Sequence, residues 1–421
     1  MNDLKVIKLN SKSNLYIKKT KKFKSIAISV VYKMKYDYKN ISAFNILAKY
    51  LGNSSNTYQS IEKFNKYIDS LYGTSFGIKS DYIGSLFTFS VFANYINPKF
   101  IKDETLTEKV IKLLSDCIYD PMINNNIFDE ELFSICKENC LVDVESLQEY
   151  NLPYIVRKLK SIISMNTHSS MAMSIHGDKK TLKSLNNVNI YKYYKRLIEA
   201  PFDIYITGDV TYKEIIALIN KYYKNRKTKK VSYNVFDMVS DNTYDPLVIK
   251  KNVSQSKIAI AYKIPILFND DRHYAFRIAR LVLTGTLSSK FYKVIREQMG
   301  LCYSISSNYS SYYGTFIVTT GVASENIEKV VKEVDNQIKN LQNGLLSDDE
   351  FKQAKEAILN DMYSVDDSIF GVLDMIKTYN SFNYDFDYKK ELEKYEKVTK
   401  EDVIKVSKLL SYITYVTLDK E

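Results

Sequence analysis

One pattern of strands and helices occurs twice along this chain, and this duplication constrains the fold more than any other feature. In the first half the β-rich run KSIAISVVYKM (Lys24–Met34) precedes the apolar helix pattern SAFNILAKYLG and, further on, the strand pattern SLFTFSVFA. In the second half QSKIAIAYKIP (Gln255–Pro265), HYAFRIARLVLTG and TFIVTTGVA follow in the same order. The copies are offset by roughly 210 to 230 residues, which is too long for a solenoid repeat and indicates two similar domains.

The order of elements in each half predicts an α+β domain with a mixed, mostly antiparallel sheet and helices packed on one face. Helical periodicity lapses in a polar, basic stretch between the halves. We therefore predict an N-terminal domain at 1–224, a linker at 225–245 and a C-terminal domain at 246–421. A doubly wound nucleotide-binding fold is disfavoured, because no G-x-G-x-x-G or Walker loop follows a strand.

The composition is that of an ordinary globular protein. Hydrophobic residues make up 45% of the chain and charged residues 26%, a balance typical of soluble domains. No apolar run approaches the length of a bilayer crossing, and the N-terminal stretch lacks the apolar core of a secretory signal. We therefore expect no membrane insertion and a cytoplasmic location.

The net charge of +11 raises the question of a nucleic-acid partner. The lysines are spread along the whole chain, and the one dense run, KNRKTKK, is typical of a solvated linker. Because no pattern resembles a nucleic-acid recognition module, we expect no nucleic acid among the partners.

Three strings carry a resemblance to a known family. They are IDSLYGTSFG (Ile68–Gly77), APFDIYITGDV (Ala200–Val210) and IREQMGLCYSISSNYSSYYGTFIV (Ile295–Val318). In this order and spacing they resemble the insulinase-like (pitrilysin-like, M16) zinc peptidases, and the first is similar to a segment of a non-catalytic bacterial branch. The resemblance extends from about Lys24 to the C-terminus and implies a duplicated insulinase-like fold.

Active members of that family carry H-x-x-E-H on the first helix. Two histidines four residues apart lie on one helix face and bind zinc, and the glutamate between them acts as general base. In SAFNILAKYLG the resemblance sets Asn45 and Lys49 in the histidine positions and Ala48 in the base position. No histidine precedes His168. We therefore expect a degenerate site that holds no metal.

Two downstream glutamates match by spacing those that active members carry on a later helix. Glu138 and Glu145 are seven residues apart, so on a helix both point the same way. Without the histidines, we interpret them as surface carboxylates or ion-pair partners of Lys49. The three histidines and four cysteines show no standard ligand spacing, and we expect locally bonded or exposed imidazoles and reduced thiols.

A second group of residues keeps the pattern of active relatives. Arg296 lies near the end of the helix pattern SSKFYKVIREQM, Gly300 ends that helix, and Tyr303 begins the next strand. Such a corner can bring a guanidinium and a phenol to one place. The resemblance implies that this pair contacts the substrate and stabilises a developing oxyanion. A further helix is predicted to begin with a capping box at Ser347 and Glu350.

The resemblance implies a non-catalytic, substrate-binding or regulatory subunit of a heterodimeric zinc metallopeptidase that processes peptides or proteins. The expected partner is a sister subunit that bears H-x-x-E-H and holds the zinc, so this chain needs no cofactor of its own. One alternative is a structural or scaffolding protein of the same fold. Others are an accessory factor in peptide maturation or elongation-factor modification, and a stand-alone hydrolase with unrecognised chemistry.

Overall fold

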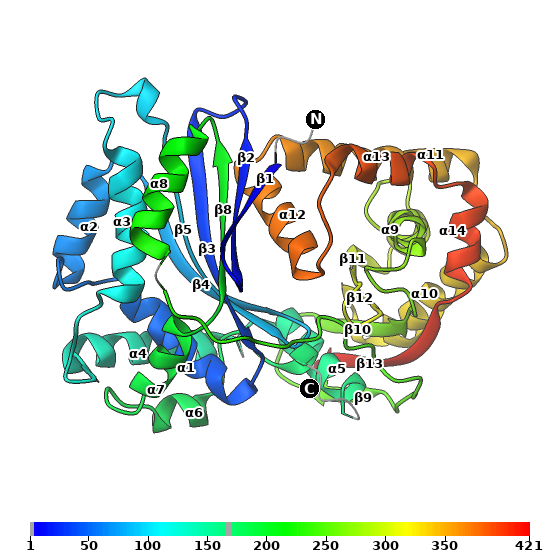
Figure 1. The fold of residues 1–421 in the computed structure, drawn as a ribbon. Coiled ribbons are helices and arrows are strands. Elements are labelled where there is room, and N and C mark those ends of the chain that lie inside the picture. The colour runs from blue at the N-terminus through cyan, green and yellow to red at the C-terminus, as the bar shows by residue number, and fades with distance from the viewer. Residues whose placement is uncertain (1–3, 148, 166–169, 225) are drawn as a thin grey trace. The chain divides into compact units, whose positions relative to one another are not determined.

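The computed structural model describes residues 4–147, 149–165, 170–224 and 226–421. The chain forms two compact units, each built around its own sheet (Figure 1). The first unit comprises Met1–Ser146, Ser174–Asn234 and Asp366–Phe386, and the second comprises Leu147–Met173, Val235–Val365 and Asp387–Glu421. Both units combine helices with a sheet, so the predicted α+β class is confirmed.

The first unit holds a six-stranded sheet in the order β1-β2-β8-β3-β5-β4. Every pair of neighbours is antiparallel except β2 with β8. The central strand β3 is buried along most of its length, which explains its nearly continuous apolar sequence, since both of its faces are covered. The strands are β1 (Leu4–Asn10), β2 (Ser13–Lys19), β3 (Ser25–Lys35), β4 (Ser75–Ile83), β5 (Leu86–Ile96) and β8 (Phe202–Gly208), with a separate hairpin of β6 (Ile123–Asn124) and β7 (Ile127–Phe128).

Helices cover both faces of this sheet, and not one face alone as the order of elements predicted, because α12 (Ile369–Ser381) comes from the second half of the chain. On β3, Ile28 and Val30 pack into the large core that lies under most of the helices, whereas Ala27 and Val31 point to the opposite face and pack with α12. The helices of the large core are α1 (Tyr38–Leu51), α2 (Ile61–Ser70), α3 (Leu106–Tyr119), α4 (Glu130–Ser146), α6 (Lys179–Ser184), α7 (Tyr191–Ile198) and α8 (Tyr212–Tyr223).

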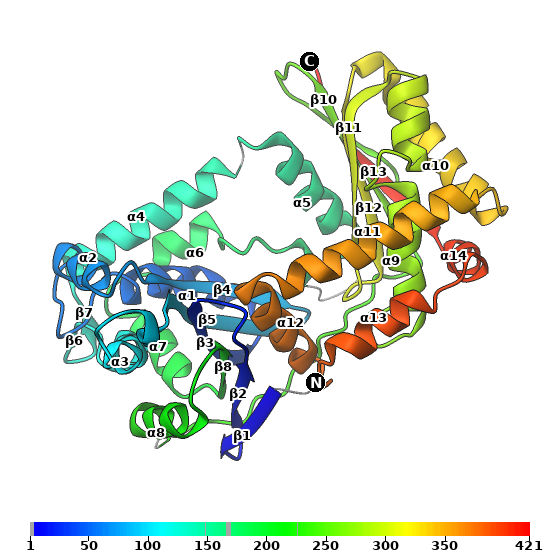
Figure 2. The same cartoon turned by 90° about the horizontal axis from the view of Figure 1, so that it is seen from above.

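The second unit holds a five-stranded sheet in the order β11-β12-β10-β13-β9, in which only β13 with β9 is a parallel pair. One face packs against α5 (Asn151–Ile163), and the remaining helices lie on the other side (Figure 2). The strands are β9 (Leu247–Lys250), β10 (Ser256–Lys263), β11 (Cys302–Ser310), β12 (Thr315–Val322) and β13 (Ser411–Asp419). The helices are α9 (Arg272–Leu283), the π-helix η3 (Tyr292–Gln298), α10 (Ile327–Gln342), α11 (Asp348–Asp366), α13 (Tyr388–Glu396) and α14 (Lys400–Ser407).

The two units exchange one helix each, and in this respect they differ from the contiguous domains expected at 1–224 and 246–421. Helix α5, from the first half, belongs to the second unit, and α12, from the second half, belongs to the first. In Figure 2 the chain can be traced from α4 to α5 and from α11 to α12, where it passes from one unit to the other. Each exchanged helix has an apolar stripe, but the stripe does not encode which sheet it covers.

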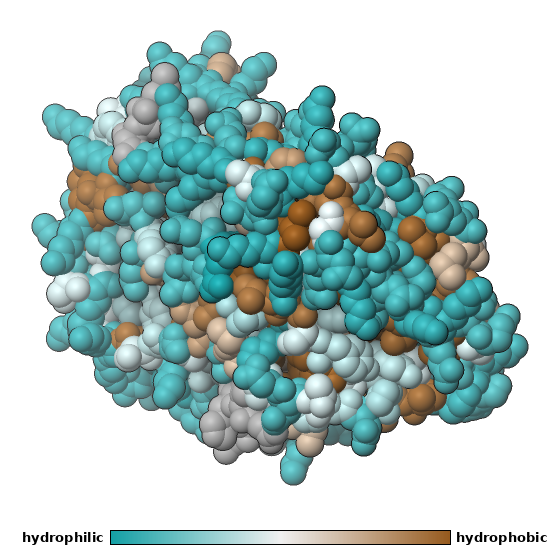
Figure 3. All heavy atoms as spheres, turned by 90° about the vertical axis from the view of Figure 1, so that its right-hand side faces the viewer, coloured by the Kyte–Doolittle hydropathy of each residue, from teal (hydrophilic) through white to brown (hydrophobic). Residues whose placement is uncertain are grey.

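No helix in the described part of the chain is long and apolar enough to cross a membrane. The face drawn in Figure 3 is mainly hydrophilic, with hydrophobic residues in small separate groups. Among the described large hydrophobic side chains, Tyr303 is the most exposed, at 82%. A single exposed ring is common on protein surfaces, but this one lies on β11 with the Arg296 guanidinium beside it.

Candidate functional site

Helix α1 carries Asn45, Ala48 and Lys49, which the resemblance assigns to a degenerate metal site. The Asn45 side-chain amide donates to the backbone carbonyl of Ile175 at 2.6 Å, and its oxygen accepts from the Ser80 hydroxyl. Ala48 is half-buried and has no group that can transfer a proton. The amide that stands in a histidine position is therefore occupied by local structural contacts.

Lys49 forms an ion pair that the sequence did not indicate. Its ammonium nitrogen lies 3.0 Å from an Asp143 carboxylate oxygen. The expected partners lie elsewhere: Glu145 pairs with Lys179 at 2.6 Å, and Glu138 is exposed. Helix α4 turns its 140–144 side toward α1, so the residue two positions before Glu145 reaches Lys49 instead. The reading of the two glutamates as surface carboxylates agrees with their exposure, whereas their pairing with Lys49 is not observed.

The residues around Lys49 do not suit zinc. Helix α1 presents the Lys49 ammonium group and the hydrogen-bonded Asn45 amide there, and a cation repels a dication. Burial raises the pKa of both nearby thiols, Cys136 and Cys140, to about 12, so they stay protonated and bind metal poorly. Among the described residues, no three His, Cys, Asp or Glu side chains form a group that could hold a metal ion.

The second predicted pair is brought together. The Arg296 guanidinium carbon lies 5.6 Å from the centre of the Tyr303 ring and 4.3 Å from the centre of the Tyr292 ring. Gly300 makes this corner possible, because its φ of +61° reverses the chain between helix and strand. The structure therefore contains the corner that the sequence predicted, although its role in substrate contact stays a prediction.

Tyr292 was missed by the sequence reasoning. It lies four residues before Arg296 on η3, a π-helix. A π-helix has more than four residues per turn, so side chains four apart stack almost directly, and the Tyr292 ring supports the guanidinium. Short π-helical segments often occur at functional sites. The spacing Tyr-x-x-x-Arg before a glycine was the available signal, but a π-helix cannot be told from an α-helix by periodicity.

Tyr303 is the second residue of an edge strand, β11. Strand β11 is bonded to β12 on one side and stands at the end of the sheet on the other. The register between the two strands shifts between Cys302 and Ile305, a bulge that redirects Tyr303 toward solvent. No charged residue or proline occurs from Gly300 to Ser324. Edge strands are commonly protected by such residues, and β11 lacks that protection.

A buried ion pair holds η3 in place. The Lys290 ammonium lies 3.2 Å from a carboxylate oxygen of Glu350, and both side chains are largely buried. Glu350 and Ser347 also form the predicted capping box of α11, with the two bonds at 2.9 and 3.1 Å, so that prediction is confirmed. The segment that carries Arg296 is thus tied to the N-terminus of α11.

Replacing Glu350 by glutamine is expected to destabilise the chain by about 2 kcal/mol at neutral pH, because Lys290 stays buried without its anion. Burial alone raises the pKa of Glu350, but the Ser347 N–H and Lys290 outweigh it and hold that pKa below its usual value. A carboxyl group whose pKa is lower in the folded state stabilises the fold at pH values above its pKa in the unfolded state. This stabilisation is lost as the pH falls through its pKa in the folded state.

The difference between wild type and Glu350→Gln should therefore shrink when pH falls from 7 to about 3. Urea denaturation at several pH values measures it. The exposed Glu325→Gln serves as matched control and should show no such dependence. An equal loss at both ends of the pH range would contradict the assignment.

The histidines and cysteines have local surroundings. His273 is buried, its Nδ1 lies 3.3 Å from the Tyr309 hydroxyl, and burial lowers its pKa to about 3, which keeps it neutral. His176 is half-buried, and His168 lies outside the described residues. All four cysteines are free and buried in the structure.

Known proteins resemble this chain over part or most of its length. Residues 184–358 match the family described as "Peptidase M16 inactive domain". A Bacillus subtilis (strain 168) protein named "Probable inactive metalloprotease YmfF" is 24% identical over 409 residues, which cover 95% of this chain and 94% of that protein. An "Uncharacterized zinc protease" of Rickettsia bellii (strain RML369-C) is 23% identical over 240 residues, covering 56% of each.

Solved structures share the fold. A conserved protein from Enterococcus faecalis V583 superposes with a TM-score of 0.92 at 21% identity, covering 100% of this chain and 99% of that one. The peptidase M16 inactive domain from Pseudomonas fluorescens gives a TM-score of 0.81 at 13% identity, covering 99% and 98%. The fold, the family match and the substituted H-x-x-E-H positions agree with one another. This chain is similar to proteins of the M16 peptidase family, among them one named as a probable inactive metalloprotease, and residues 184–358 match the inactive domain of that family.

Proposed function

We propose that this chain is the non-catalytic, substrate-binding subunit of a heterodimeric zinc metallopeptidase. The observation that carries the proposal is an asymmetry between its two half-sites. The zinc positions hold Asn45, Ala48 and Lys49 in local contacts, whereas Arg296 and Tyr303 lie together at the end of an open strand. A chain that binds a peptide at this corner but has no metal site would need another subunit to supply the zinc and the general base.

The exposed edge of β11 supports binding of an extended peptide by β-augmentation. A peptide pairs its backbone with the unpaired N–H and C=O groups of an edge strand. The uncharged stretch around β11 presents no like charge or proline to oppose this pairing. Peptide bound along β11 would pass Tyr303 at the bulge and reach Arg296.

Arg296 is suited to a carbonyl that gains negative charge. Its guanidinium carries five N–H donors in a rigid fork, and its contact with Glu297 at 3.5 Å is too long for a strong hydrogen bond. The aromatic rings of Tyr292 and Tyr303 hold the fork in one orientation. Zinc in the partner would activate the attacking water. Fixed donors near the developing oxyanion would lower the barrier further.

Co-purification followed by metal and activity measurements tests the proposal. A tagged form of this chain is used to isolate its partner, and zinc is measured on the chain alone and on the complex. Both are then assayed with a mixture of fluorogenic peptides. Support requires an H-x-x-E-H partner, one zinc per complex, none on this chain, and cleavage by the complex only.

Two results would overturn the proposal. Stoichiometric zinc and peptidase activity on the isolated chain would make it a stand-alone hydrolase. A stable complex with an H-x-x-E-H partner that cleaves no peptide would favour the scaffolding role. A cytoplasmic location, and a part in peptide maturation or elongation-factor modification, remain predictions from the sequence and the resemblance.

A further inference from the structure

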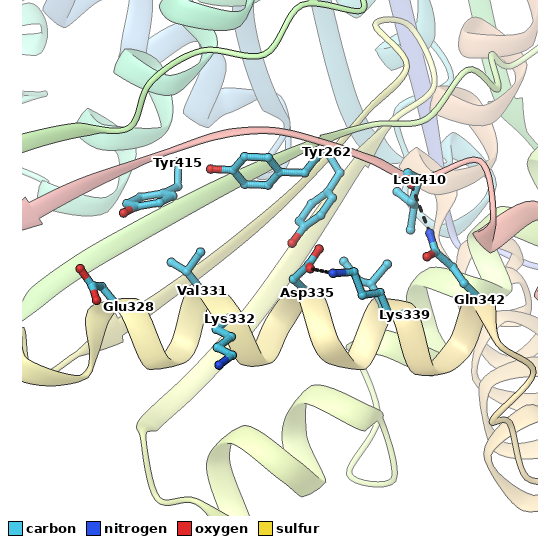
Figure 4. Close-up of a pocket in the computed structure, with 11 residues that line it drawn as sticks. Tyr262, Glu328, Val331, Lys332, Asp335, Lys339, Gln342, Leu410 and Tyr415 are labelled. Carbon is cyan, nitrogen blue, oxygen red and sulfur yellow. Dashed lines mark hydrogen bonds and ion pairs between the residues drawn. The ribbon is translucent and has the colours of Figure 1, made fainter.

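A groove of about 570 Å³ lies in the second unit between α10 and the strands β10 and β13 (Figure 4). Its volume falls within the range of sites that bind small molecules or single side chains. Arg296 lies on η3 and Tyr303 on β11, and neither residue lines this groove, so the groove is separate from the candidate site. Nothing in the proposed function uses it.

Three tyrosines form the strand side of the groove. Tyr262 on β10 pairs in register with Tyr412 on β13, and their rings meet edge to face at 5.9 Å. Tyr415 extends the row along β13. The register between the two strands shifts between Ala261 and Tyr262. This bulge helps bring three large rings to one place.

Helix α10 forms the opposite side and presents carboxylates to the rings. Glu328, Val331 and Asp335 are three and four residues apart and so share one helix face. Figure 4 shows these side chains directed at the tyrosines, whereas Lys332 points away from them. Gln342 closes one end, where its amide donates to the Leu410 carbonyl at 3.2 Å.

The groove contains a buried polar atom without a partner. Tyr262 is 1% exposed, and its hydroxyl forms no hydrogen bond within the described part of the chain. Burial raises the pKa of this phenol, which therefore stays neutral and keeps its oxygen lone pairs available. Buried hydroxyls almost always have a partner. This phenol lies beneath the groove, whereas the rings of Tyr412 and Tyr415 are only half-buried and border it.

Two carboxylates and two lysines line the groove, and one carboxylate, that of Glu328, is available to a cation. Asp335 is paired with Lys339 at 2.6 Å on the same helix. Glu328 is exposed, and in the residues that the structure describes no ion pair involves its carboxylate. A carboxylate beside aromatic faces is the combination that binds ammonium and guanidinium groups, because the ring faces carry negative charge density.

We propose that this groove binds an organic cation, an alkylammonium or guanidinium group, between Glu328 and the rings of Tyr262, Tyr412 and Tyr415. The cation comes from a basic side chain of a peptide or from a free polyamine. Its N–H groups donate to the Glu328 carboxylate, and its charge lies against the half-buried rings of Tyr412 and Tyr415. This site goes beyond the proposed function and does not depend on it.

Calorimetric titration of the full chain tests the site with three probes. They are spermidine, the peptide acetyl-Gly-Lys-Gly-amide, and the same peptide with norleucine in place of lysine. At least one cationic probe should bind about tenfold more tightly than the norleucine peptide. Binding of the lysine peptide alone identifies a protein side chain as the source, and binding of spermidine alone identifies a free polyamine.

Variants locate the binding. Glu328→Gln and Tyr415→Leu are each expected to weaken binding about fivefold or more, whereas Tyr415→Phe keeps the ring and should bind like wild type. Urea denaturation confirms that each variant is folded. The proposal is overturned if no cationic probe binds up to about 10 mM. It is also overturned if the norleucine peptide binds equally well, or if both weakening variants bind like wild type.

Discussion

Replacing Arg296 by alanine is expected to lower kcat/KM of the paired peptidase by about 100-fold, the usual effect of removing one fixed donor to an oxyanion. The loss should appear mainly in kcat, because the donor acts most strongly when negative charge develops on the substrate. The stability of the chain should change little, since Arg296 is partly exposed and its contacts are with Tyr292 and Tyr303. Initial rates with a fluorogenic peptide measure the effect.

Two further variants separate charge from geometry. Arg296→Lys keeps the positive charge but loses the rigid fork, so it should recover only part of the activity. Arg272→Ala removes an exposed arginine of α9 that pairs with Asp270, and should leave kcat/KM unchanged. Wild-type kcat/KM in Arg296→Ala would show that this guanidinium does not contact the reacting peptide.

Replacing Lys33 by methionine should destabilise the chain by about 3–5 kcal/mol. Lys33 on β3 forms an ion pair with Asp203 on β8, and their side chains are only 15% and 2% exposed. Asp203 also accepts a hydrogen bond from the Asn14 backbone at 2.9 Å. Without the ammonium, a carboxylate would remain buried inside the sheet of the first unit.

Urea denaturation of the full chain measures this loss of stability. Two control variants test whether the loss comes from the buried charge. The double variant Lys33→Met with Asp203→Asn removes the buried charge and should recover most of the stability. Lys66→Met breaks an exposed pair with Glu62 on α2 and should have no measurable effect. If Lys33→Met unfolds at the wild-type urea concentration, the pair contributes nothing to the fold.

The duplicated strand and helix patterns predicted the α+β class and the family, because both depend on local periodicity and on strings that lie within single elements. The Arg296–Tyr303 corner was predictable for the same reason: Gly300 lies between them in seven residues of chain. The Lys49–Asp143 pair was not, since it depends on how α4 is rotated against α1. A one-residue difference in rotation decides whether an aspartate or a glutamate reaches the lysine.

Long-range packing set the other limit. On α5 the spacing of Ile155, Leu159 and Ile163 predicts an amphipathic helix, but it does not predict which sheet the helix packs against. The sheet strands it meets come from residues more than 90 positions later. The Tyr262 groove was equally hidden, because it depends on a strand bulge and on one face of α10 meeting β13.

The exchange of α5 and α12 has a consequence for how this polypeptide can be divided. A fragment that stops in 225–245 would lack α12, so Tyr16, Val31 and Tyr205 would face water. The same fragment would carry α5 with its apolar stripe uncovered. Two fragments divided between the repeats would therefore each expose apolar surface and fold poorly. To fold, each fragment would need the exchanged helix that the other fragment contains.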